Sequence, residues 1–126
     1  MKRLYIGPTK STPEIDFDPE KNVLSIKGES YPENSFEFYN PIFEWLENYF
    51  NNLSDNKKVI FKFDISYLNT SSTKSIIFIL DIIEEAYKNN KNIIINWYYD
   101  EENEFSYEIA ETFMEDLNIP FNMIKK

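Results

Sequence analysis

The sequence has no cysteine and no histidine among its 126 residues, and it has only two glycines. The lack of cysteine excludes disulfides, thiol nucleophiles and thiolate metal sites, and the lack of histidine excludes Ser–His dyads and imidazole ligands. An active site built from carboxylates or lysine alone stays open, but the usual general base near neutral pH is missing. The composition therefore points away from enzymes, and we predict no cofactor.

Basic residues are also scarce, with 13 Lys and Arg against 22 Asp and Glu, which gives a net charge of −9. Such a chain repels phosphate backbones and has no basic stripe for counterion release, so we expect no nucleic-acid binding. No stretch approaches the roughly 20 apolar residues of a membrane span, and the N-terminal segment lacks the apolar run of a signal sequence. We therefore expect a cytoplasmic protein without membrane insertion.

Aromatic residues, in contrast, are plentiful at 17% of the chain, with eleven Phe and nine Tyr. They supply ample material for a hydrophobic core, which argues against global disorder. The length suits one compact domain, and we expect it to span residues 1–126.

The stretch from Phe61 to Leu80 organises the rest of the chain, because it changes from the period of a strand to the period of a helix. The residues expected on the buried face of the strand are Phe61, Phe63, Ile65 and Tyr67. The apolar stripe expected on the helix consists of Ile76, Ile79, Leu80, Ile83, Ala86 and Tyr87. Between them lies a turn of four hydroxyl residues and one amide, Asn69–Thr73.

The other periodic segments extend this pattern to the order β, ββ, α, β, α, β, α, β. The further strands are predicted at Leu4–Ile6, Glu14–Phe17, Val23–Lys27, Asn92–Tyr99 and Ile119–Ile124, and a last amphipathic helix from Phe105 to Leu117. Strands that alternate with helices imply right-handed parallel crossovers, and the early pair joined by Asp18–Asn22 implies an antiparallel hairpin. We therefore predict an α/β fold with a mixed sheet, an N-terminal hairpin and about three helices, in which the β-branched strand Asn92–Tyr99 is buried on both faces.

The first helix has two candidate starting points after a predicted loop at Gly28–Ser35. Asn40 is a favourable N-cap and Pro41 is tolerated at the first helical position, so a start at Asn40 is the primary prediction. A start at Ser35 is the alternative, and it would place Pro41 inside the helix.

The hydroxyl turn is the leading candidate for chemistry. The N-terminus of a helix has unpaired N–H groups and a partial positive charge, so a phosphate on Thr70, Ser71 or Ser72 would be tolerated there. Ordinary N-capping by Ser and Thr explains the same residues, and from the local sequence alone it is the more common explanation.

Three other candidates have simpler explanations. The acidic turn Asp100–Glu104 lacks the ligand spacing of a calcium loop and suits the start of a helix. A catalytic pair of Asp64 and Asp81 is not expected, because one lies on the polar face of a strand and the other on the polar side of a helix. The aromatic run Trp97–Tyr99 could stack on bases, but the acidic balance favours a role in the core or an interface.

Specific strings stand at three places: Ser-Tyr-Pro-Glu-Asn-Ser at 30–35, Asp-Ile-Ser-Tyr-Leu-Asn-Thr-Ser-Ser-Thr-Lys at 64–74, and Trp-Tyr-Tyr-Asp at 97–100. Together they resemble the SiaC family of bacterial regulatory phosphoproteins, and the likeness extends from Ser11 to Phe121. That family is similar in fold to the STAS domain of anti-sigma factor antagonists. The resemblance therefore implies a STAS-like domain for residues 1–126.

The resemblance also implies a signalling role without enzymatic activity. Thr70 matches the family's phosphoacceptor, although Thr73 and Ser75 bring further hydroxyls close to the motif. The implied partners are a Ser/Thr protein kinase, a PP2C-type phosphatase that removes the phosphate, and a diguanylate cyclase that the unphosphorylated form binds and activates. The implied output is a rise in cyclic di-GMP that favours aggregation or biofilm formation.

The residues expected to bind partners surround this turn. They are Tyr31, Pro32, Glu33, Asn34, Asn69, Ser71, Ser72 and Lys74. For residues 31–34, a structural loop that caps the next helix is an equal alternative. A small-molecule or nucleotide-binding module is the alternative function, in which the same helix N-terminus holds the phosphate of a ligand.

Overall fold

The N-terminal strands form an antiparallel unit in the computed structural model, which describes all residues from 1 to 126. Strand β1 (Leu4–Ile6) pairs with β2 (Glu14–Asp18), and β2 pairs with β3 (Val23–Ser30). In the turn between β2 and β3, Asp18 Oδ1 accepts hydrogen bonds from two backbone N–H groups, and Asn22 adopts a φ of 56°. The predicted hairpin is confirmed, with the turn residues that the sequence indicated.

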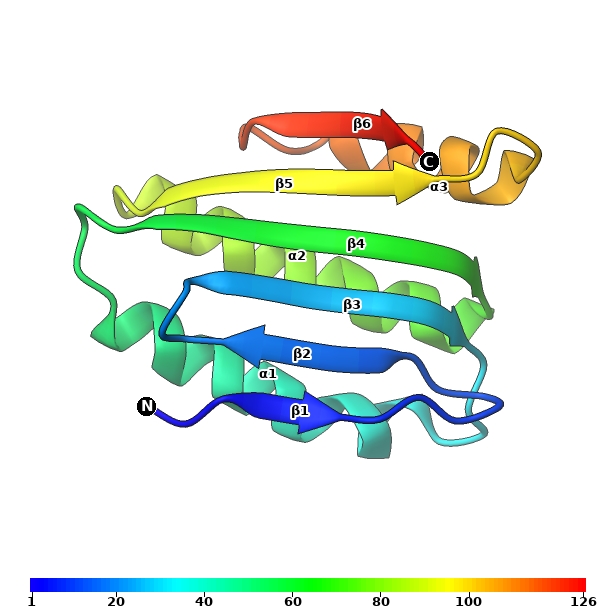
Figure 1. The fold of residues 1–126 in the computed structure, drawn as a ribbon, viewed down its shortest axis with the longest axis horizontal. Helices are drawn as coiled ribbons and strands as arrows, with labels where there is room; N and C mark the ends of the chain where they lie inside the picture. The colour runs from blue at the N-terminus through cyan, green and yellow to red at the C-terminus, as the bar shows by residue number, and fades with distance from the viewer.

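The second half of the chain adds three parallel strands to the same sheet. These are β4 (Lys58–Leu68), β5 (Asn92–Tyr99) and β6 (Phe121–Lys125), and the sheet order follows the chain order from β1 to β6. Figure 1 shows the six strands side by side, with the helices behind them. The predicted element order and the mixed sheet are confirmed.

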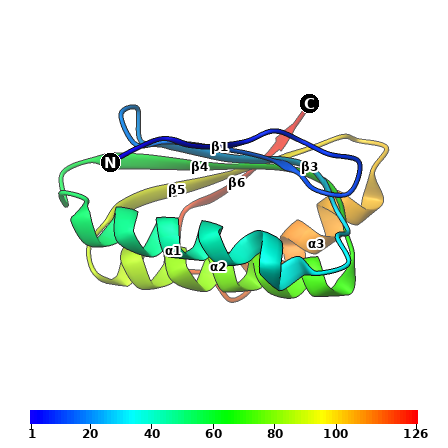
Figure 2. The same cartoon turned by 90° about the horizontal axis from the view of Figure 1, so that it is seen from below.

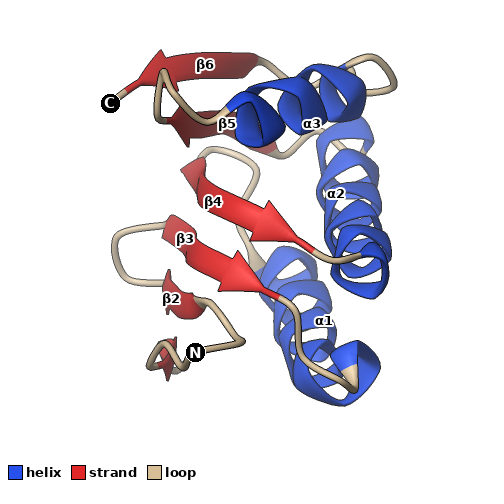
Figure 3. Ribbon diagram, turned by 90° about the vertical axis from the view of Figure 1, so that its right-hand side faces the viewer, coloured by secondary structure: helices blue, strands red, loops and turns tan.

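Each parallel crossover contains one helix: α1 (Ser35–Asn52), α2 (Thr70–Lys88) or α3 (Glu104–Met114). Because the strands are added in one direction and crossovers of this kind share one hand, all three helices lie on the same face of the sheet. Figures 2 and 3 show this two-layer arrangement, with the other face of the sheet left uncovered. None of the helices has the length and apolar character needed to cross a membrane.

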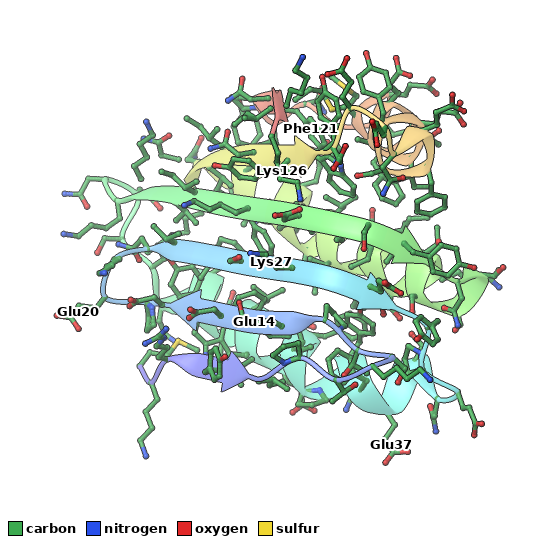
Figure 4. The ribbon with its side chains drawn as sticks, turned by 45° about the vertical axis from the view of Figure 1, so that its right-hand side comes forward. Glu14, Glu20, Lys27, Glu37, Phe121 and Lys126 are labelled. Atoms are coloured by element: carbon green, nitrogen blue, oxygen red, sulfur yellow. The ribbon has the colours of Figure 1, made fainter.

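The uncovered face corrects the prediction for β5. Its residues Ile93, Ile95 and Trp97 are buried under the helices, but Ile94 and Asn96 on the other face are partly exposed. Strand β5 is thus buried on one face only, because no helix packs on the second. Charged side chains instead lie on the uncovered face, as Figure 4 shows for Glu14, Lys27 and Lys126.

Helix α1 begins at Ser35, so the predicted start at Asn40 is wrong and the alternative start is right. Asn34 is the N-cap, and its Oδ1 accepts a hydrogen bond of 3.0 Å from Glu37 N. Pro41 lies inside the helix, where it lacks the N–H that would bond to Glu37 O. The earlier start lets α1 bury Tyr39 completely against the sheet.

An irregularity in β4 changes the predicted face of Tyr67. The pairing with β3 steps from Gly28–Ile65 to Glu29–Tyr67, so Ser66 has no residue opposite it. Such a bulge reverses the alternation of faces, and Tyr67 is therefore 45% exposed instead of buried. Gly28, at a φ of 124°, belongs to strand β3, which continues to Ser30 where a loop was predicted.

The core is rich in stacked aromatic rings. The ring centroids of Phe61 and Phe63 are 4.7 Å apart, and those of Phe63 and Trp97 are 5.3 Å apart. Trp97 is fully buried and its Nε1 donates to Ser106 Oγ at 3.1 Å, so it belongs to the core. The predicted stripe of α2 is also confirmed, with Tyr87 at its partly exposed edge.

Helix α3 and the last strand are shorter than predicted. The helix ends at Met114, before Leu117, and its buried residues are Ser106, Ala110 and Phe113. Strand β6 begins at Phe121, two residues after the predicted Ile119.

Candidate functional site: the N-terminus of α2

Asn69 lies between the last residue of strand β4 and the first residue of helix α2. Its extended backbone (φ −77°, ψ 176°) turns the chain, and its side-chain Oδ1 accepts a hydrogen bond of 2.8 Å from Ser72 N. Its backbone N–H donates to Ser30 O at 2.9 Å, which ties the turn to the end of β3. Asn69 is therefore the N-cap of α2, as the capping interpretation of this turn expected.

The four hydroxyls that follow differ in their surroundings. Ser71 Oγ donates to Asn69 Oδ1 at 3.2 Å, and Thr73 Oγ1 donates to Asn69 O at 2.9 Å. Ser72 is fully buried, and its Oγ lies 2.7 Å from Ser30 Oγ. Thr70 is exposed, and its hydroxyl is the one of the four without a hydrogen bond inside the protein. Three of the four hydroxyls thus make hydrogen bonds within the protein, and the Thr70 hydroxyl is accessible from solvent.

A cluster of buried hydroxyls lies on the interior side of the turn and supports it. Ser30 Oγ lies 2.7 Å from Tyr39 OH as well as from Ser72 Oγ, and Ser35 Oγ lies 2.9 Å from Ser75 Oγ. Burial raises the pKa of the Tyr39 hydroxyl to about 12, and the hydrogen bond to Ser30 opposes this only in part. These contacts join the end of β3, the start of α1 and the start of α2, so the base of the turn is fixed on three elements.

The segment 31–34 combines the two roles that the sequence left open. Asn34 caps α1, which is a structural role. Glu33 is exposed, and together with Asn34 it lines the same surface depression as Ser71 and Lys74. The structure therefore brings Glu33 and Asn34 together with Ser71 and Lys74 at the start of α2, whereas Ser72 is buried.

An aromatic patch beside Thr70 was missed by sequence reasoning. Exposed Tyr67 packs between Tyr31 and Phe105, with ring centroids 6.4 Å and 5.3 Å away. Asn103 caps α3 and donates from Nδ2 to Ser66 O at 3.0 Å, which holds the start of α3 against the end of β4. The patch depends on the bulge at Ser66, and nothing in the local sequence pattern indicates that bulge.

The acidic candidates do not form a catalytic or metal centre. Asp64 Oδ1 is 2.9 Å from Lys126 Nζ on the uncovered face of the sheet, whereas Asp81 lies on α2 under the other face. Asp100 Oδ1 accepts from Glu102 N in the turn before α3, consistent with the start of a helix. No group of three or more potential metal-ligating side chains is arranged around a common point.

The electrostatic surroundings of Thr70 suit an anion. The residue is the first of α2, where the helix N-terminus carries partial positive charge, and Lys74 follows one turn later without a salt bridge. Thr70 does not line any of five surface depressions with volumes between about 320 and 660 Å³. The site is thus an exposed hydroxyl that lies outside these depressions, on a turn held by buried hydrogen bonds.

Known proteins with the same fold include regulatory phosphoproteins. The family model described as SiaC family regulatory phosphoprotein matches residues 6–126. An uncharacterised protein of Pseudomonas aeruginosa (strain UCBPP-PA14) is 40% identical over 122 residues, which cover 96% of this chain and 94% of that protein.

Two solved structures are also similar along nearly the whole chain. The crystal structure of apo-SiaC from Pseudomonas aeruginosa has a TM-score of 0.91 at 37% identity, covering 98% of this chain and 99% of that one. The crystal structure of the diguanylate cyclase SiaD in complex with its activator SiaC, from the same organism, contains a chain with the same TM-score, identity and coverage. The family match, the curated relative and these structures agree, and the chain belongs to the SiaC family of regulatory phosphoproteins.

Proposed function

We propose that the chain is a non-enzymatic phosphorylation switch whose acceptor is Thr70. The observation that carries this proposal is the state of the four hydroxyls: Thr70 alone is both exposed and without an internal hydrogen bond. A Ser/Thr protein kinase would add the phosphate and a PP2C-type phosphatase would remove it. The unphosphorylated form would bind and activate a diguanylate cyclase in the cytoplasm.

The free protein can accommodate the phosphate without rearrangement. An anion at an exposed helix N-terminus is stabilised by about 0.3–1 kcal/mol, and a phosphate carries about −1.5 to −2 charges. Lys74, at the i+4 position, lies on the same side of α2 and is free to pair with it. The phosphate therefore leaves the fold of the switch intact.

A partner packed around Thr70 would respond differently. The surface there includes exposed Tyr67, partly exposed Tyr31, and Ile77 two turns along α2, which is 43% exposed. Burying a phosphate in such an interface costs a few kcal/mol unless it is paired, and about 2.8 kcal/mol is a hundredfold in affinity. The phosphate would thus act as a local block to binding.

The residues proposed to contact the partner are those that share the Thr70 surface. They are Tyr31, Pro32, Glu33, Asn34, Tyr67, Asn69, Ser71 and Lys74. Ser72 is left out because its side chain is fully buried. The choice of a cyclase as partner is supported by the Pseudomonas aeruginosa complex, in which SiaC is the activator of SiaD. Control of biofilm or aggregation through cyclic di-GMP would follow.

Site mapping with the cognate kinase tests the acceptor. The wild-type chain should gain one phosphate, Thr70→Ala should gain none, and Thr73→Ala should still gain one. Thr73 is the matched control because it is a threonine in the same turn whose hydroxyl is held by Asn69 O. Single phosphorylation of Thr70→Ala, mapped to Ser71 or Thr73, would show that the acceptor is misassigned.

A further inference from the structure

Most of the buried polar side chains of this protein lie around the start of α2. Six polar or charged residues are buried, and four of them are Ser30, Ser35, Ser72 and Ser75. These four come from the end of β3, the start of α1 and the first turns of α2, which meet at one end of the sheet in Figure 1. A buried polar network specifies one arrangement when all its members have partners, and no buried side-chain nitrogen or oxygen lacks one here.

Ser30 holds the segment that carries Thr70 at two points. Its carbonyl oxygen accepts a hydrogen bond of 2.9 Å from Asn69 N, and its Oγ lies 2.7 Å from Ser72 Oγ. Thr70 lies between these two contacts, one residue after the first and two residues before the second. Residues 69–72 therefore form a short loop that is fixed at both ends to one residue of β3.

The bulge in β4 makes this double contact possible. Because Ser66 has no residue opposite it in β3, the register moves by one residue and Ser30 pairs with Leu68. Leu68 is the last residue of β4, so Asn69 leaves the strand directly beside Ser30. Ser30 is 1% exposed and Ser72 is fully buried, so water does not compete for the contact between their hydroxyls.

The position of the Thr70 hydroxyl depends on the backbone that carries it. Thr70 Oγ1 makes no hydrogen bond within the protein that would hold it directly. The contacts on either side of Thr70 therefore decide where this oxygen lies relative to a bound kinase. In phosphoryl transfer the attacking oxygen must lie in line with the phosphorus, and a misplacement of about 1 Å can cost up to about a hundredfold in rate.

We propose that Ser30 and Ser72 are positioning residues for the phosphorylation of Thr70, an inference that rests on the proposed function. Their hydroxyl contact holds Thr70 Oγ1 in line with the γ-phosphorus of ATP on the kinase, and neither buried side chain touches the kinase. Oγ1 forms the new bond to phosphorus, the bond from phosphorus to the oxygen bridging to the β-phosphate breaks, and ADP leaves. The hydroxyl proton passes to a base of the kinase.

A contact that serves stability alone would change the reaction in another way. A variant that is partly unfolded offers less competent substrate, which raises the kinase concentration needed for half-saturation and leaves the rate at saturation unchanged. A folded variant with a displaced acceptor binds the kinase as the wild type does, but it transfers the phosphate more slowly at saturation. The two quantities therefore distinguish positioning from stability.

Single-turnover phosphorylation, with the cognate kinase in excess and ATP saturating, measures both quantities. Ser72→Ala removes the contact and leaves Ser30 Oγ its hydrogen bond with Tyr39 OH. Tyr39→Phe is the matched control, because it removes the other hydrogen bond of Ser30 Oγ and leaves the contact with Ser72. Each variant loses one hydroxyl from the same buried chain, and Ser30 Oγ keeps one partner in both.

We expect Ser72→Ala to lower the rate at saturation by at least about tenfold, with half-saturation within about twofold of the wild type. Ser30→Ala cuts the same contact from the other side and should give the same pattern. Tyr39→Phe should keep the wild-type rate at saturation, because the segment that carries Thr70 is still held at both points.

The outcomes separate this inference from the proposed function. If the wild type is phosphorylated on Thr70 and both serine variants keep its rate at saturation, the positioning role is overturned while the switch stands. An equal loss of that rate in Tyr39→Phe would overturn the positioning role as well. If the wild type is instead phosphorylated at another residue, the proposed acceptor and the positioning role are both wrong.

Discussion

Tyr39→Phe probes the buried hydroxyl cluster that supports the Thr70 turn, and it should lower stability at neutral pH but have little effect near pH 11. The variant removes one hydroxyl from a fully buried side chain and keeps the ring. Ser30 Oγ retains Ser72 Oγ as a partner, so no buried polar group is left unsatisfied. At pH 7 the loss should be that of one neutral hydrogen bond, about 0.5–1.5 kcal/mol of unfolding free energy.

At alkaline pH the wild-type protein loses stability that the Tyr39→Phe variant keeps. The pKa of Tyr39 is raised by burial from 10.0 to about 12 in the folded protein, so the unfolded chain releases this proton first. The stability that depends on Tyr39 is complete below pH 10 and is lost as pH rises through the folded-state pKa. At 1.36 kcal/mol per pKa unit the full loss is about 2.7 kcal/mol, and about half of it, near 1.4 kcal/mol, has occurred by pH 11.

The wild-type and Tyr39→Phe stability curves should therefore approach each other above pH 10 and meet near pH 11. Urea unfolding between pH 7 and pH 11, followed by the fluorescence of Trp45 and Trp97, measures both curves. All other titrating groups are shared, so their effects cancel in the difference. Tyr107→Phe, at a position 40% exposed, controls for loss of a tyrosine hydroxyl as such. A gap between wild type and Tyr39→Phe that stays constant from pH 7 to pH 11 would refute the role assigned to burial.

Two further predictions concern the turn itself. Asn69→Ala removes the acceptor of the Ser72 N–H and should lower the unfolding free energy by about 1 kcal/mol, as measured by urea unfolding. Asn69→Asp keeps an acceptor and should be about as stable as the wild type. Equal losses for both variants would contradict the capping role. Guanine and adenine nucleotides, including cyclic di-GMP, should leave the melting temperature unchanged, and a rise that grows with ligand concentration would instead favour the small-molecule-binding alternative.

The regular parts of the fold follow from patterns that are local in the sequence. The helical spacing from Ile76 to Ala86 predicted the buried face of α2. Just past the end of that helix Asn90 takes a φ of 73°, a conformation that asparagine tolerates. The element order and the hairpin were predictable for the same reason. The single-sided burial of β5 was not, because it depends on the direction in which strands are added to the sheet.

The errors have particular physical causes. Asn40-Pro41 and Asn34-Ser35 are both acceptable helix starts. The earlier start is favoured because it buries Tyr39 against Ser30, a contact that the local sequence does not reveal. The bulge at Ser66 arises from pairing with β3, so the exposure of Tyr67 could not be seen in β4 alone.

The sequence predicted the position of the turn but not the hydrogen bonds of its side chains. The sequence placed the hydroxyls of residues 70–73 at a helix N-terminus, and the family likeness selected Thr70. Ser71 and Thr73 bond to the nearby Asn69, but the buried contact of Ser72 is with Ser30, 42 positions away in the chain.

The most direct test of the switch is the activity of the diguanylate cyclase with the two forms of this chain. Cyclic di-GMP production should be measured with unphosphorylated protein, with protein carrying one phosphate on Thr70, and with the latter after PP2C treatment. Unphosphorylated protein should activate the cyclase, and the phosphorylated form should need an about hundredfold higher concentration for the same activation. PP2C treatment should restore activation at the original concentration. Equal activation by the phosphorylated and unphosphorylated forms would contradict it.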